Sequence, residues 1–469
     1  MSVENTHFGA EKIAHVMKSV RSIFLIGIGG ISMAALAELS LARGLSVGGS
    51  DRNTTALTER LQEKGIRVFE GHRAEQVRAY DAVVYTVAIG EDNPEYVEAK
   101  RLGKPLLSRA DYLGYLMTEF KQRIGISGMH GKTTCTAMCA DILLAAADPT
   151  VMCGAQLASL GGSPCRIGTE RSHFLFEACE YMDSFLDFNP SLAVILNIGL
   201  DHVDYFHSME QIRSSFLQFA ERTGSAEDGC VLYNADDAET KRALEPFQGN
   251  KIGFGVEGDA DFTARNAVQK NGIISFDFCH DGNLLTRLEL HATGRHNVYN
   301  ALAAASAAYL CGISTDAIQK GLAAFCGAGR RMEKKGMLAS GAVVYDDYGH
   351  HPDEIRATLA GAREMGFSRI LCAYQPHTYS RTAGLLDDFS VAFADADQVY
   401  LADIYAAREQ NVYGVTSETL AARIGEKAAY CGSFENLAAA LLRDARADDL
   451  VIVMGAGDVY KTFSLLGLT

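Results

Sequence analysis

A strand that runs into a short glycine loop, and then into a helix, restricts this chain more than any other feature of its sequence. Ile124 to Ser127 predict a buried strand, 128–134 carry Gly-Met-His-Gly-Lys-Thr-Thr, and Cys135 to Ala147 predict the helix. Backbone N–H groups at a helix N-terminus and a lysine ammonium can together hold a triphosphate, and a threonine hydroxyl can ligate Mg²⁺. The strand, loop and helix in this order favour a phosphate-binding loop over an ordinary glycine turn.

The loop is a shortened form of the usual phosphate-binding pattern. The full pattern, Gly-x-x-x-x-Gly-Lys-Ser/Thr, needs a glycine at position 126, where this chain has Ile126. The Thr133 hydroxyl is the predicted metal ligand. We predict that the whole loop binds ATP phosphates through Gly128, Met129, His130, Gly131, Lys132, Thr133 and Thr134.

Acidic and polar side chains follow the next two predicted strands of the same block. Glu177 closes the apolar run 174–176, Glu180 follows it, and Asp-His-Val-Asp occupies 201–204 after the next strand. Carboxylates suit Mg²⁺, whereas imidazole is a less usual ligand for it. Taken alone, 201–204 is more typical of a polar turn. The position of both groups at strand tips, where parallel sheets bind ligands, favours a metal site instead.

A second glycine turn lies near the start of the chain. An apolar strand from Ser22 runs into Gly-Ile-Gly-Gly at 27–30, a helix is predicted over Ile31 to Arg43, and another strand follows. The third glycine of the dinucleotide fingerprint is missing, so the match to an NAD site is only partial. Asp51 is placed to hold a ribose hydroxyl, and the same geometry suits the diphosphate of a UDP-sugar. A tight turn required only by packing is the remaining alternative.

The predicted elements form three α/β blocks. Strand, glycine turn, helix and strand in the first block predict a right-handed βαβ unit on a parallel sheet. The stretch from Gly253 to Glu289 alternates apolar residues with turn signals and predicts antiparallel strands. The fold class is α/β, with Rossmann-like first and third domains around a central ATPase domain. We place the domains at 1–115, 116–330 and 331–469, with the other predicted strands at 81–86, 172–177, 192–198, 342–346, 369–374, 398–402 and 450–454.

Composition excludes several classes of protein. The net charge of −15, from 43 basic and 58 acidic side chains, argues against a nucleic-acid-binding protein. No apolar run approaches the roughly 20 residues that cross a bilayer, and the first residues lack a secretory signal, so we expect no membrane partner and a cytoplasmic address. The 11 cysteines form no Cys-x-x-Cys pair and are expected to be buried, reduced thiols.

Several motifs in their order along the chain resemble the Mur ligases, which build the peptide of the bacterial cell-wall precursor. The central block carries Gly-x-x-Gly-Lys-Thr-Thr, Glu-Ala-x-Glu and Asn-Ile-x-x-Asp-His, and then Gly-Arg-His-Asn-x-x-Asn-Ala from Gly294. Three further features resemble the members that add L-alanine to UDP-N-acetylmuramate. These are Gly-Ile-Gly-Gly-Ile-Ser-Met from Gly27, Asp-Asp-Tyr-Gly-His-His-Pro from Asp346, and Gln-Pro-His-x-Tyr-x-Arg-Thr from Gln375.

The resemblance implies an ATP- and Mg²⁺-dependent ligase for these small-molecule substrates, and it assigns roles to individual residues. Thr133, Glu177 and His202 would hold the metal, Asn297 would contact adenine, and Arg330-Arg331 would be a hinge into the third domain, with Arg330 at the ATP. His350, His377 and Arg381 would face the amino acid or the reacting phosphoryl group, with Tyr348 in the same element. The predicted catalytic residues are Lys132, Glu177, His202, Asp347, His350 and Arg381, and the predicted UDP-sugar site is Gly29, Gly30, Asp51 and Thr86.

Two positions depart from the family pattern. Thr378 stands where many members have arginine, so one cation expected at the amino-acid site is absent. Cys179 replaces the usual aspartate of Glu-Ala-Asp-Glu, which weakens any acidic role there. Both departures leave the chemistry intact and bear on the choice of amino acid.

The implied chemistry explains why these residue types are needed. A carboxylate does not accept an amine directly, and transfer of a phosphoryl group from ATP makes an acyl-phosphate whose phosphate can leave. Lys132 and Mg²⁺ would neutralise the charge on the transferring group. Because a free amine is mostly ammonium near pH 7, a base must remove a proton, and we assign this role to His350, oriented by Asp347. A helix-capping turn is the alternative for His350-His351-Pro352.

Other functions remain to be weighed. A ligase that re-attaches a recycled murein peptide to the same UDP-sugar is the nearest, and a folate-polyglutamate ligase would share only the central loop. An NAD-dependent dehydrogenase explains the first block only, and a non-catalytic nucleotide switch does not need Glu177, His202 and a third domain together. The sequence does not decide among L-alanine, glycine and L-serine, or between a monomer and a weak homodimer.

Overall fold

The first sheet is built from five parallel strands in the order β3-β2-β1-β4-β5. The predicted βαβ unit is confirmed: β1 and β2 pair in parallel, with α2 between them in the chain. The strands are β1 (Ser22–Ile26), β2 (Ser46–Asp51), β3 (Arg67–Glu70), β4 (Ala82–Tyr85) and β5 (Leu106–Ser108). The helices are α1 (Ala10–Met17), α2 (Ile31–Ala42), α3 (Ala56–Glu63), α4 (Pro94–Arg101) and α5 (Arg109–Met117), with a 3₁₀ turn η1 (Ala74–Val77).

The central sheet has ten strands in the order β15-β14-β13-β12-β11-β10-β6-β9-β7-β8. Its middle is parallel, and the predicted antiparallel strands form the β13-β14-β15 end. The strands are β6 (Gln122–Ser127), β7 (Thr150–Leu157), β8 (Ser163–Arg166), β9 (His173–Glu177), β10 (Leu192–Ile195), β11 (Cys230–Asn234), β12 (Lys251–Gly255), β13 (Phe262–Lys270), β14 (Ile273–His280) and β15 (Asn283–His291). The helices are α6 (Lys132–Leu144), α7 (Met209–Gly224), α8 (Ala238–Ala243), α9 (Arg295–Leu310) and α10 (Thr315–Ala323), with 3₁₀ turns η2 (Ala158–Leu160) and η3 (Tyr181–Asp187).

The third sheet has six strands in the order β16-β17-β21-β18-β19-β20, and all its pairs are parallel except β16-β17. The strands are β16 (Glu333–Met337), β17 (Val343–Asp347), β18 (Arg369–Tyr374), β19 (Gln398–Ala402), β20 (Ala428–Gly432) and β21 (Asp449–Met454). The helices are α11 (Pro352–Arg363), α12 (Tyr379–Gly384), α13 (Leu386–Ala392), α14 (Ser417–Ile424), α15 (Phe434–Asp444) and α16 (Thr462–Leu465), with a 3₁₀ turn η4 (Asp458–Lys461).

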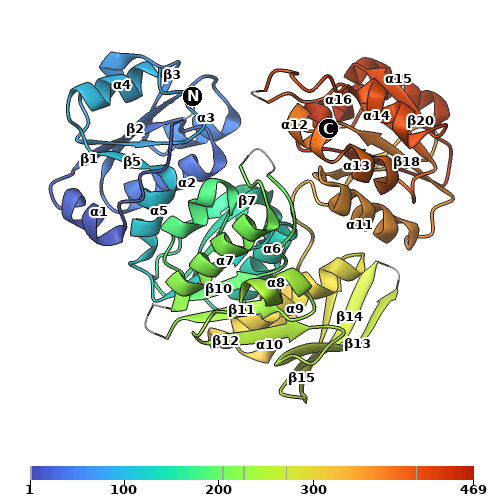
Figure 1. Ribbon diagram of the computed structural model, residues 1–469, viewed down its shortest axis with the longest axis horizontal. Coiled ribbons are helices and arrows are strands. Elements are labelled where there is room, and N and C mark those ends of the chain that lie inside the picture. The colour runs from blue at the N-terminus through green and yellow to red at the C-terminus, as the bar shows by residue number, and fades with distance from the viewer. Residues whose placement is uncertain are drawn as a thin grey trace.

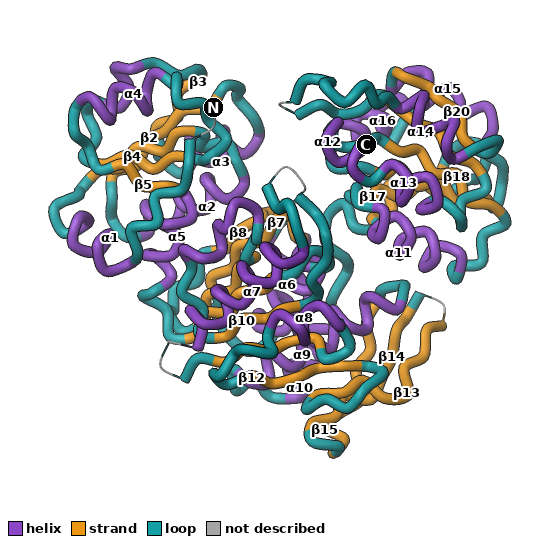
Figure 2. The backbone as a smooth tube through the Cα atoms, viewed as in Figure 1, coloured by secondary structure: helices purple, strands orange, loops and turns teal. Residues whose placement is uncertain are grey.

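The computed structural model describes residues 3–202, 205–224, 226, 228–270, 272–407 and 409–468. Figure 1 shows three lobes, with the N-terminal lobe in blue at the upper left, the C-terminal lobe in red at the upper right, and the central lobe below and between them. Figure 2 shows that each lobe has strands at its centre and helices around them. Within the described ranges, no helix has the length and apolar character needed to cross a bilayer.

Most cysteines are buried and free, as the sequence predicted. All eleven are described and free, and most are buried, as expected for reduced thiols in a packed core. Cys135 and Cys139 lie in α6 within the apolar core that this helix shares with α9. The buried cysteines therefore contribute to packing, whereas Cys326 is exposed and departs from the prediction.

Candidate functional site

The helix after the phosphate loop begins earlier than predicted. Helix α6 starts at Lys132, with Gly131 as its N-cap in the left-handed region (φ 83°). Thr133 and Thr134 therefore lie in the first helical turn instead of in a loop, and the prediction of a helix from Cys135 is wrong by three residues. The cause is local, because a left-handed glycine lets the chain enter the helix directly after the turn. The lysine and both threonines now belong to the N-terminal turn, whose free N–H groups attract phosphate.

Asn197, just past strand β10, holds the loop in place. Its Oδ1 accepts the His130 N–H at 2.9 Å, and its Nδ2 donates to the His130 carbonyl at 3.0 Å. The Met129 N–H donates to the Asn197 carbonyl at 3.2 Å. The amide thus fixes the backbone of the loop from both sides.

The ammonium of Lys132 is bound by a carboxylate that the sequence analysis left without a role. Its Nζ lies 3.0 and 3.1 Å from the two carboxylate oxygens of Glu180, and 2.5 Å from the Gly128 carbonyl. Glu180 is fully buried, and its second partner is His202, whose Nε2 lies 3.2 Å away. Burial opposes the charge of Lys132, but Glu180 outweighs it and raises the lysine pKa. A phosphate must therefore compete with Glu180 for this cation.

Thr133 and Glu177, both predicted metal ligands, are in contact. The Thr133 hydroxyl lies 3.2 Å from Oε2 of Glu177, and Oε1 accepts the Gly154 N–H at 2.5 Å. A Cβ at Gly154 would lie only 2.8 Å from the carboxylate, so glycine is needed for this approach. A hydroxyl and a carboxylate at the start of a phosphate-binding helix form a hard oxygen donor set that fits Mg²⁺. His202 instead pairs with Glu180, and Val203 and Asp204 lie outside the described residues.

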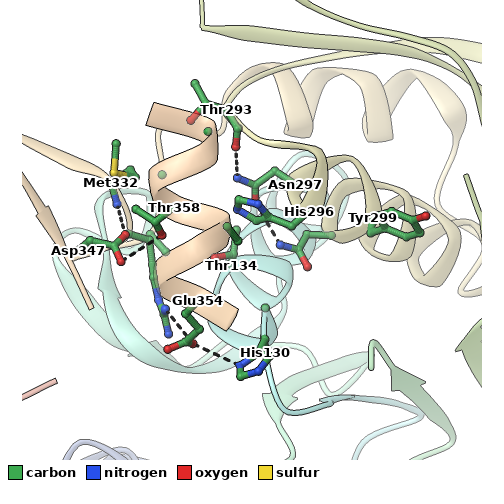
Figure 3. Close-up of a pocket in the computed structure, with 18 of the residues that line it drawn as sticks. His130, Thr134, Thr293, His296, Asn297, Tyr299, Met332, Asp347, Glu354 and Thr358 are labelled. Carbon is green, nitrogen blue, oxygen red and sulfur yellow. Dashed lines mark hydrogen bonds and ion pairs between the residues drawn. The ribbon is translucent and has the colours of Figure 1, made fainter. Parts of the chain in front are cut away.

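A cavity of about 490 Å³ opens between the central and C-terminal lobes (Figure 3). Its walls include His130, Gly131 and Thr134 from the nucleotide loop and Asn297 from α9. Asn297 donates to the Thr293 carbonyl at 2.7 Å, which fixes its amide against the cavity. The cavity therefore collects part of the predicted ATP site, and it is large enough for a nucleoside.

The two arginines at the hinge have different surroundings. Arg330 pairs with Asp346 at 3.1 Å and donates to the Gly455 carbonyl at 2.7 Å, and it is not among the described residues that line the cavity. Arg331 does line the cavity, and it lies 3.4 Å from Glu354. Arg330 as an ATP contact therefore stays a prediction, and Arg331 is the arginine of the hinge that lines the cavity. Adjacent residues outside a helix or strand give no periodicity from which to choose between them.

His350 has a different carboxylate partner from the one predicted. Its Nδ1 lies 3.1 Å from the Tyr348 carbonyl and 3.3 Å from Oε2 of Glu354. Asp347 accepts instead from the Met332 and Gly349 N–H groups, at 2.9 and 2.8 Å, so the prediction that it orients His350 is wrong. Asp347 closes the turn at the end of β17, and its carboxylate accepts from these two backbone donors and from the Thr358 hydroxyl at 3.4 Å.

The capping alternative is confirmed for the second histidine of this motif. His351 is the N-cap of α11, Pro352 is its first residue, and Glu354 completes a capping box. His350 lies just outside the helix, where it is free to face the site. One motif therefore supplies a cap and a candidate base at adjacent positions.

Arg381 joins the C-terminal lobe to the central one. Its guanidinium donates to Oδ1 of Asp201 at 2.9 and 3.1 Å, and it lies 3.0 Å from Nδ1 of His377. Both members of the pair are nearly buried, with side chains 9% and 7% exposed. Burial lowers the pKa of His350 to about 3 and that of His377 to about 4, so both imidazoles are neutral at pH 7. Arg381 is therefore the principal cation beside two neutral histidines.

The predicted UDP-sugar residues gather at the carboxyl edge of the first sheet. The Gly29 N–H donates to Oδ2 of Asp51 at 2.9 Å, and Gly27 packs against the methyl group of Thr86. Gly30 precedes α2 as its N-cap. One oxygen of Asp51 thus stabilises the glycine turn, as the alternative of a turn required by packing predicts. The binding of a UDP-sugar by Asp51 stays a prediction.

Cys179 and Thr378, the two positions that depart from the family pattern, are both described in the structure. Burial raises the pKa of the Cys179 thiol to about 11, so this position carries no charge at neutral pH. Thr378 caps α12, with its hydroxyl accepting the Arg381 N–H at 3.5 Å. The threonine thus supports the helix that carries Arg381.

Alanine at Gly131 is expected to weaken both the fold and nucleotide binding. Its Cβ would lie 2.5 Å from Oδ1 of Asn300 in a left-handed conformation. Gly366 has nearly the same φ, 82°, and no atom within 4 Å of such a Cβ, so Gly366→Ala is a matched control. The control should lose about 1–2 kcal/mol of unfolding free energy, from the backbone alone.

Gly131→Ala should lose that amount and a further 1–3 kcal/mol, roughly, because the buried Asn300 amide must move. Denaturant unfolding and ATP titration measure both effects. Equal losses in the two variants, with unchanged ATP affinity, would show that the contact with Asn300 has no role.

Three α/β lobes and a phosphate-binding loop at a helix N-terminus define the class as a nucleotide-binding enzyme. Residues 126–308 match the Mur ligase middle domain, residues 22–121 the Mur ligase family catalytic domain, and residues 330–457 the Mur ligase glutamate ligase domain. The chain belongs to the Mur ligase family, and the resemblance found from the sequence is confirmed.

Three known proteins illustrate the similarity. The UDP-N-acetylmuramate–L-alanine ligase of Acetivibrio thermocellus is 44% identical over 447 residues, which are 94% of each chain. That of Caldicellulosiruptor saccharolyticus is 44% identical over 452 residues, covering 95% of this chain and 98% of its own. The crystal structure of UDP-N-acetylmuramate–alanine ligase from Thermotoga maritima matches with a TM-score of 0.79 at 28% identity, covering 95% of this chain and 98% of that one. The predicted three-domain α/β fold is confirmed by this last match.

Proposed function

We propose that this protein joins L-alanine to the carboxylate of UDP-N-acetylmuramate, with ATP as the energy source, in the synthesis of the peptidoglycan precursor. The observation that carries the proposal is the 44% identity over 94% of the chain to a ligase with these substrates. The geometry supports it, because a phosphate loop, a carboxylate pair and a histidine–arginine cluster from two lobes face one another. The re-attachment of a recycled peptide has no comparable observation in its favour.

The central lobe would carry out the phosphoryl transfer. An oxygen of the sugar carboxylate forms a bond to the γ-phosphorus of ATP, the bond to the bridging oxygen breaks, and ADP leaves. Lys132, released from Glu180, would neutralise the transferring group, while Thr133 and Glu177 would hold Mg²⁺, with His202 nearby. The metal would supply charge neutralisation between the phosphates. His130, Asn297 and Arg331 would bind the rest of the nucleotide.

The C-terminal lobe would carry out the amide-forming step. The nitrogen of alanine attacks the acyl carbon, the bond to the phosphate oxygen breaks, and inorganic phosphate leaves. His350 is neutral, so a ring nitrogen is available for the proton that the amine must lose. An imidazole with a pKa of about 3 is a weak base, so the bound anionic substrates would have to raise that pKa for the proton transfer. Arg381, His377 and Tyr348 would position the amino acid. Contact between the lobes would keep water from the acyl-phosphate.

Each lobe would bind one of the three substrates. We propose that 1–115 binds the UDP-sugar through Gly29, Gly30, Asp51 and Thr86, that 116–330 binds ATP, and that 331–469 binds the amino acid. A soluble precursor and ATP make the cytoplasm the proposed site of action. Monomer or weak homodimer remains the proposed state.

The metal assignment predicts a shift in Mg²⁺ requirement. Glu177→Gln exchanges a carboxylate for a neutral amide of the same shape, so the Mg²⁺ concentration for half-maximal rate should rise by at least about tenfold. The ATP affinity measured without metal should stay the same, which serves as the control. An unchanged Mg²⁺ dependence would remove Glu177 from the metal site.

The proposed function is tested by following phosphate release from ATP and Mg²⁺ with UDP-N-acetylmuramate, adding amino acids one at a time. Release that requires both the UDP-sugar and L-alanine is the expected result. Release with a murein tripeptide in place of L-alanine would replace the proposal with the recycling reaction. Release with glycine or L-serine at comparable kcat/KM would widen the amino-acid specificity.

A further inference from the structure

Glu354 is a largely buried carboxylate, 10% exposed, that contacts three functional segments at once, and Figure 3 shows its contact with His130. Its Oε2 accepts the His350 N–H at 2.9 Å and lies 3.3 Å from the His350 ring nitrogen Nδ1. Its Oε1 lies 3.6 Å from Nδ1 of His130 in the nucleotide loop and 3.4 Å from Arg331 at the hinge. One oxygen thus serves the candidate base, and the other serves the nucleotide side.

The surroundings of His350 fix its tautomer. Both atoms near its Nδ1, the Tyr348 carbonyl and Oε2 of Glu354, are acceptors, so Nδ1 must carry the proton. The other ring nitrogen, Nε2, is then left with its lone pair free to accept a proton. A neutral imidazole in the opposite tautomer would have no basic nitrogen at that position.

The same carboxylate favours the protonated form of His130 in the nucleotide loop. Burial disfavours the cationic form of His130, but the bond and charge of Glu354 outweigh burial and raise the His130 pKa. Burial opposes the charge of Glu354, but the bond from His130 and the charge of Arg331 help to hold its pKa well below the ordinary value, and the backbone N–H of His350 also donates to it. The Glu354 carboxylate therefore contacts both His130 of the nucleotide loop and His350, the candidate base.

We propose that Glu354 is a positioning residue that sets the His350 tautomer and docks the C-terminal lobe on the nucleotide loop through His130, with Arg331 of the hinge beside the same oxygen. This inference rests on the proposed function, in which His350 is the base. Glu354 touches no reacting atom. It acts by presenting Nε2 of His350 as a free base and, through its other oxygen, by holding the lobe on the loop.

The test separates the effect of the Glu354 charge from the effect of its hydrogen bond in the capping box of α11. Glu354→Gln keeps a carbonyl that can accept the His350 N–H and preserve the start of α11, but removes the charge. Glu354→Ala removes both. Asp449→Asn is the matched control, because Asp449 is a buried carboxylate of the same lobe, paired with Arg369 at the far end of β21.

Glu354→Gln should lower kcat about 10²-fold, at the low end of what a general base contributes, with ATP affinity changed less than about threefold. Asp449→Asn should lower stability and leave kcat unchanged. ¹⁵N NMR of labelled histidines, with the His350 signal assigned by its loss in His350→Gln, should show Nδ1–H in the wild type and a mixture of tautomers in Glu354→Gln.

Two outcomes overturn the inference: an Nε2–H tautomer in the wild type, or full kcat in Glu354→Gln. A drop in kcat with an unchanged tautomer would restrict Glu354 to docking and overturn its role at His350. The two proposals fail separately. A wild-type enzyme that ligates no amino acid would refute the function, while the tautomer measurement would still test Glu354.

Discussion

Lys132→Met is expected to lower kcat for ligation by at least about 10³-fold. The ammonium is the lysine cation of the phosphate loop, and charge neutralisation on a transferring phosphoryl group contributes effects of this size. Methionine keeps the length of the chain and its apolar stem. Phosphate release measures the rate, and ATP titration separates binding from the chemical step.

The structure adds a complication that the motif alone does not reveal. Lys132 is paired with the buried Glu180, so removing it leaves a carboxylate with His202 as its remaining described side-chain partner. Loss of one member of a buried ion pair costs about 3–5 kcal/mol. The double variant Lys132→Met with Glu180→Gln should recover most of that stability and none of the activity. Recovery of activity in the double variant would show that Lys132 acts only by neutralising Glu180.

Local sequence patterns predicted the nucleotide loop because its chemistry is contiguous. A buried strand, a glycine turn and a helix N-terminus are set by neighbours in the chain, and β18 (Arg369–Tyr374) and β19 (Gln398–Ala402) were placed without error for the same reason. Apolar periodicity places the start of this helix at Cys135, whereas α6 begins three residues earlier, at Lys132. The left-handed Gly131 marks the true boundary.

Contacts between the lobes cannot be predicted from local sequence patterns. Asp201 and Arg381 are 180 residues apart, and His130 and Glu354 are separated by more than 200. No periodicity links residues across that distance, so a polar loop and a helix start looked unrelated. Glu354 did carry a signal, since His-Pro-Asp-Glu has the spacing of a capping box. That pattern predicts a cap, and only the fold shows that the same carboxylate reaches His350.

Asp201→Asn is expected to loosen the C-terminal lobe from the central lobe. The Asp201–Arg381 pair is nearly buried and joins the two, so replacing its carboxylate leaves an uncompensated guanidinium. Removing one member of such a pair costs about 3–5 kcal/mol, which shifts the docking equilibrium by roughly 10²–10⁴-fold. The radius of gyration from small-angle scattering should rise, and kcat should fall because the acyl-phosphate is then open to water.

Three comparisons make this prediction specific. Asp449→Asn breaks a pair inside one lobe and should leave the scattering unchanged, whereas Asp201→Leu with Arg381→Met should shift it less than the sum of the single variants. Burial opposes the charge of Asp201, but Arg381 outweighs it and holds the Asp201 pKa well below its ordinary value of 3.8. Docking strength from this pair is therefore fully present above pH 3.8 and is lost only as the pH falls further. Identical scattering curves for Asp201→Asn and the wild type would mean that other contacts hold the lobes together, and Glu354 with His130 and Arg331 would then be the principal candidate.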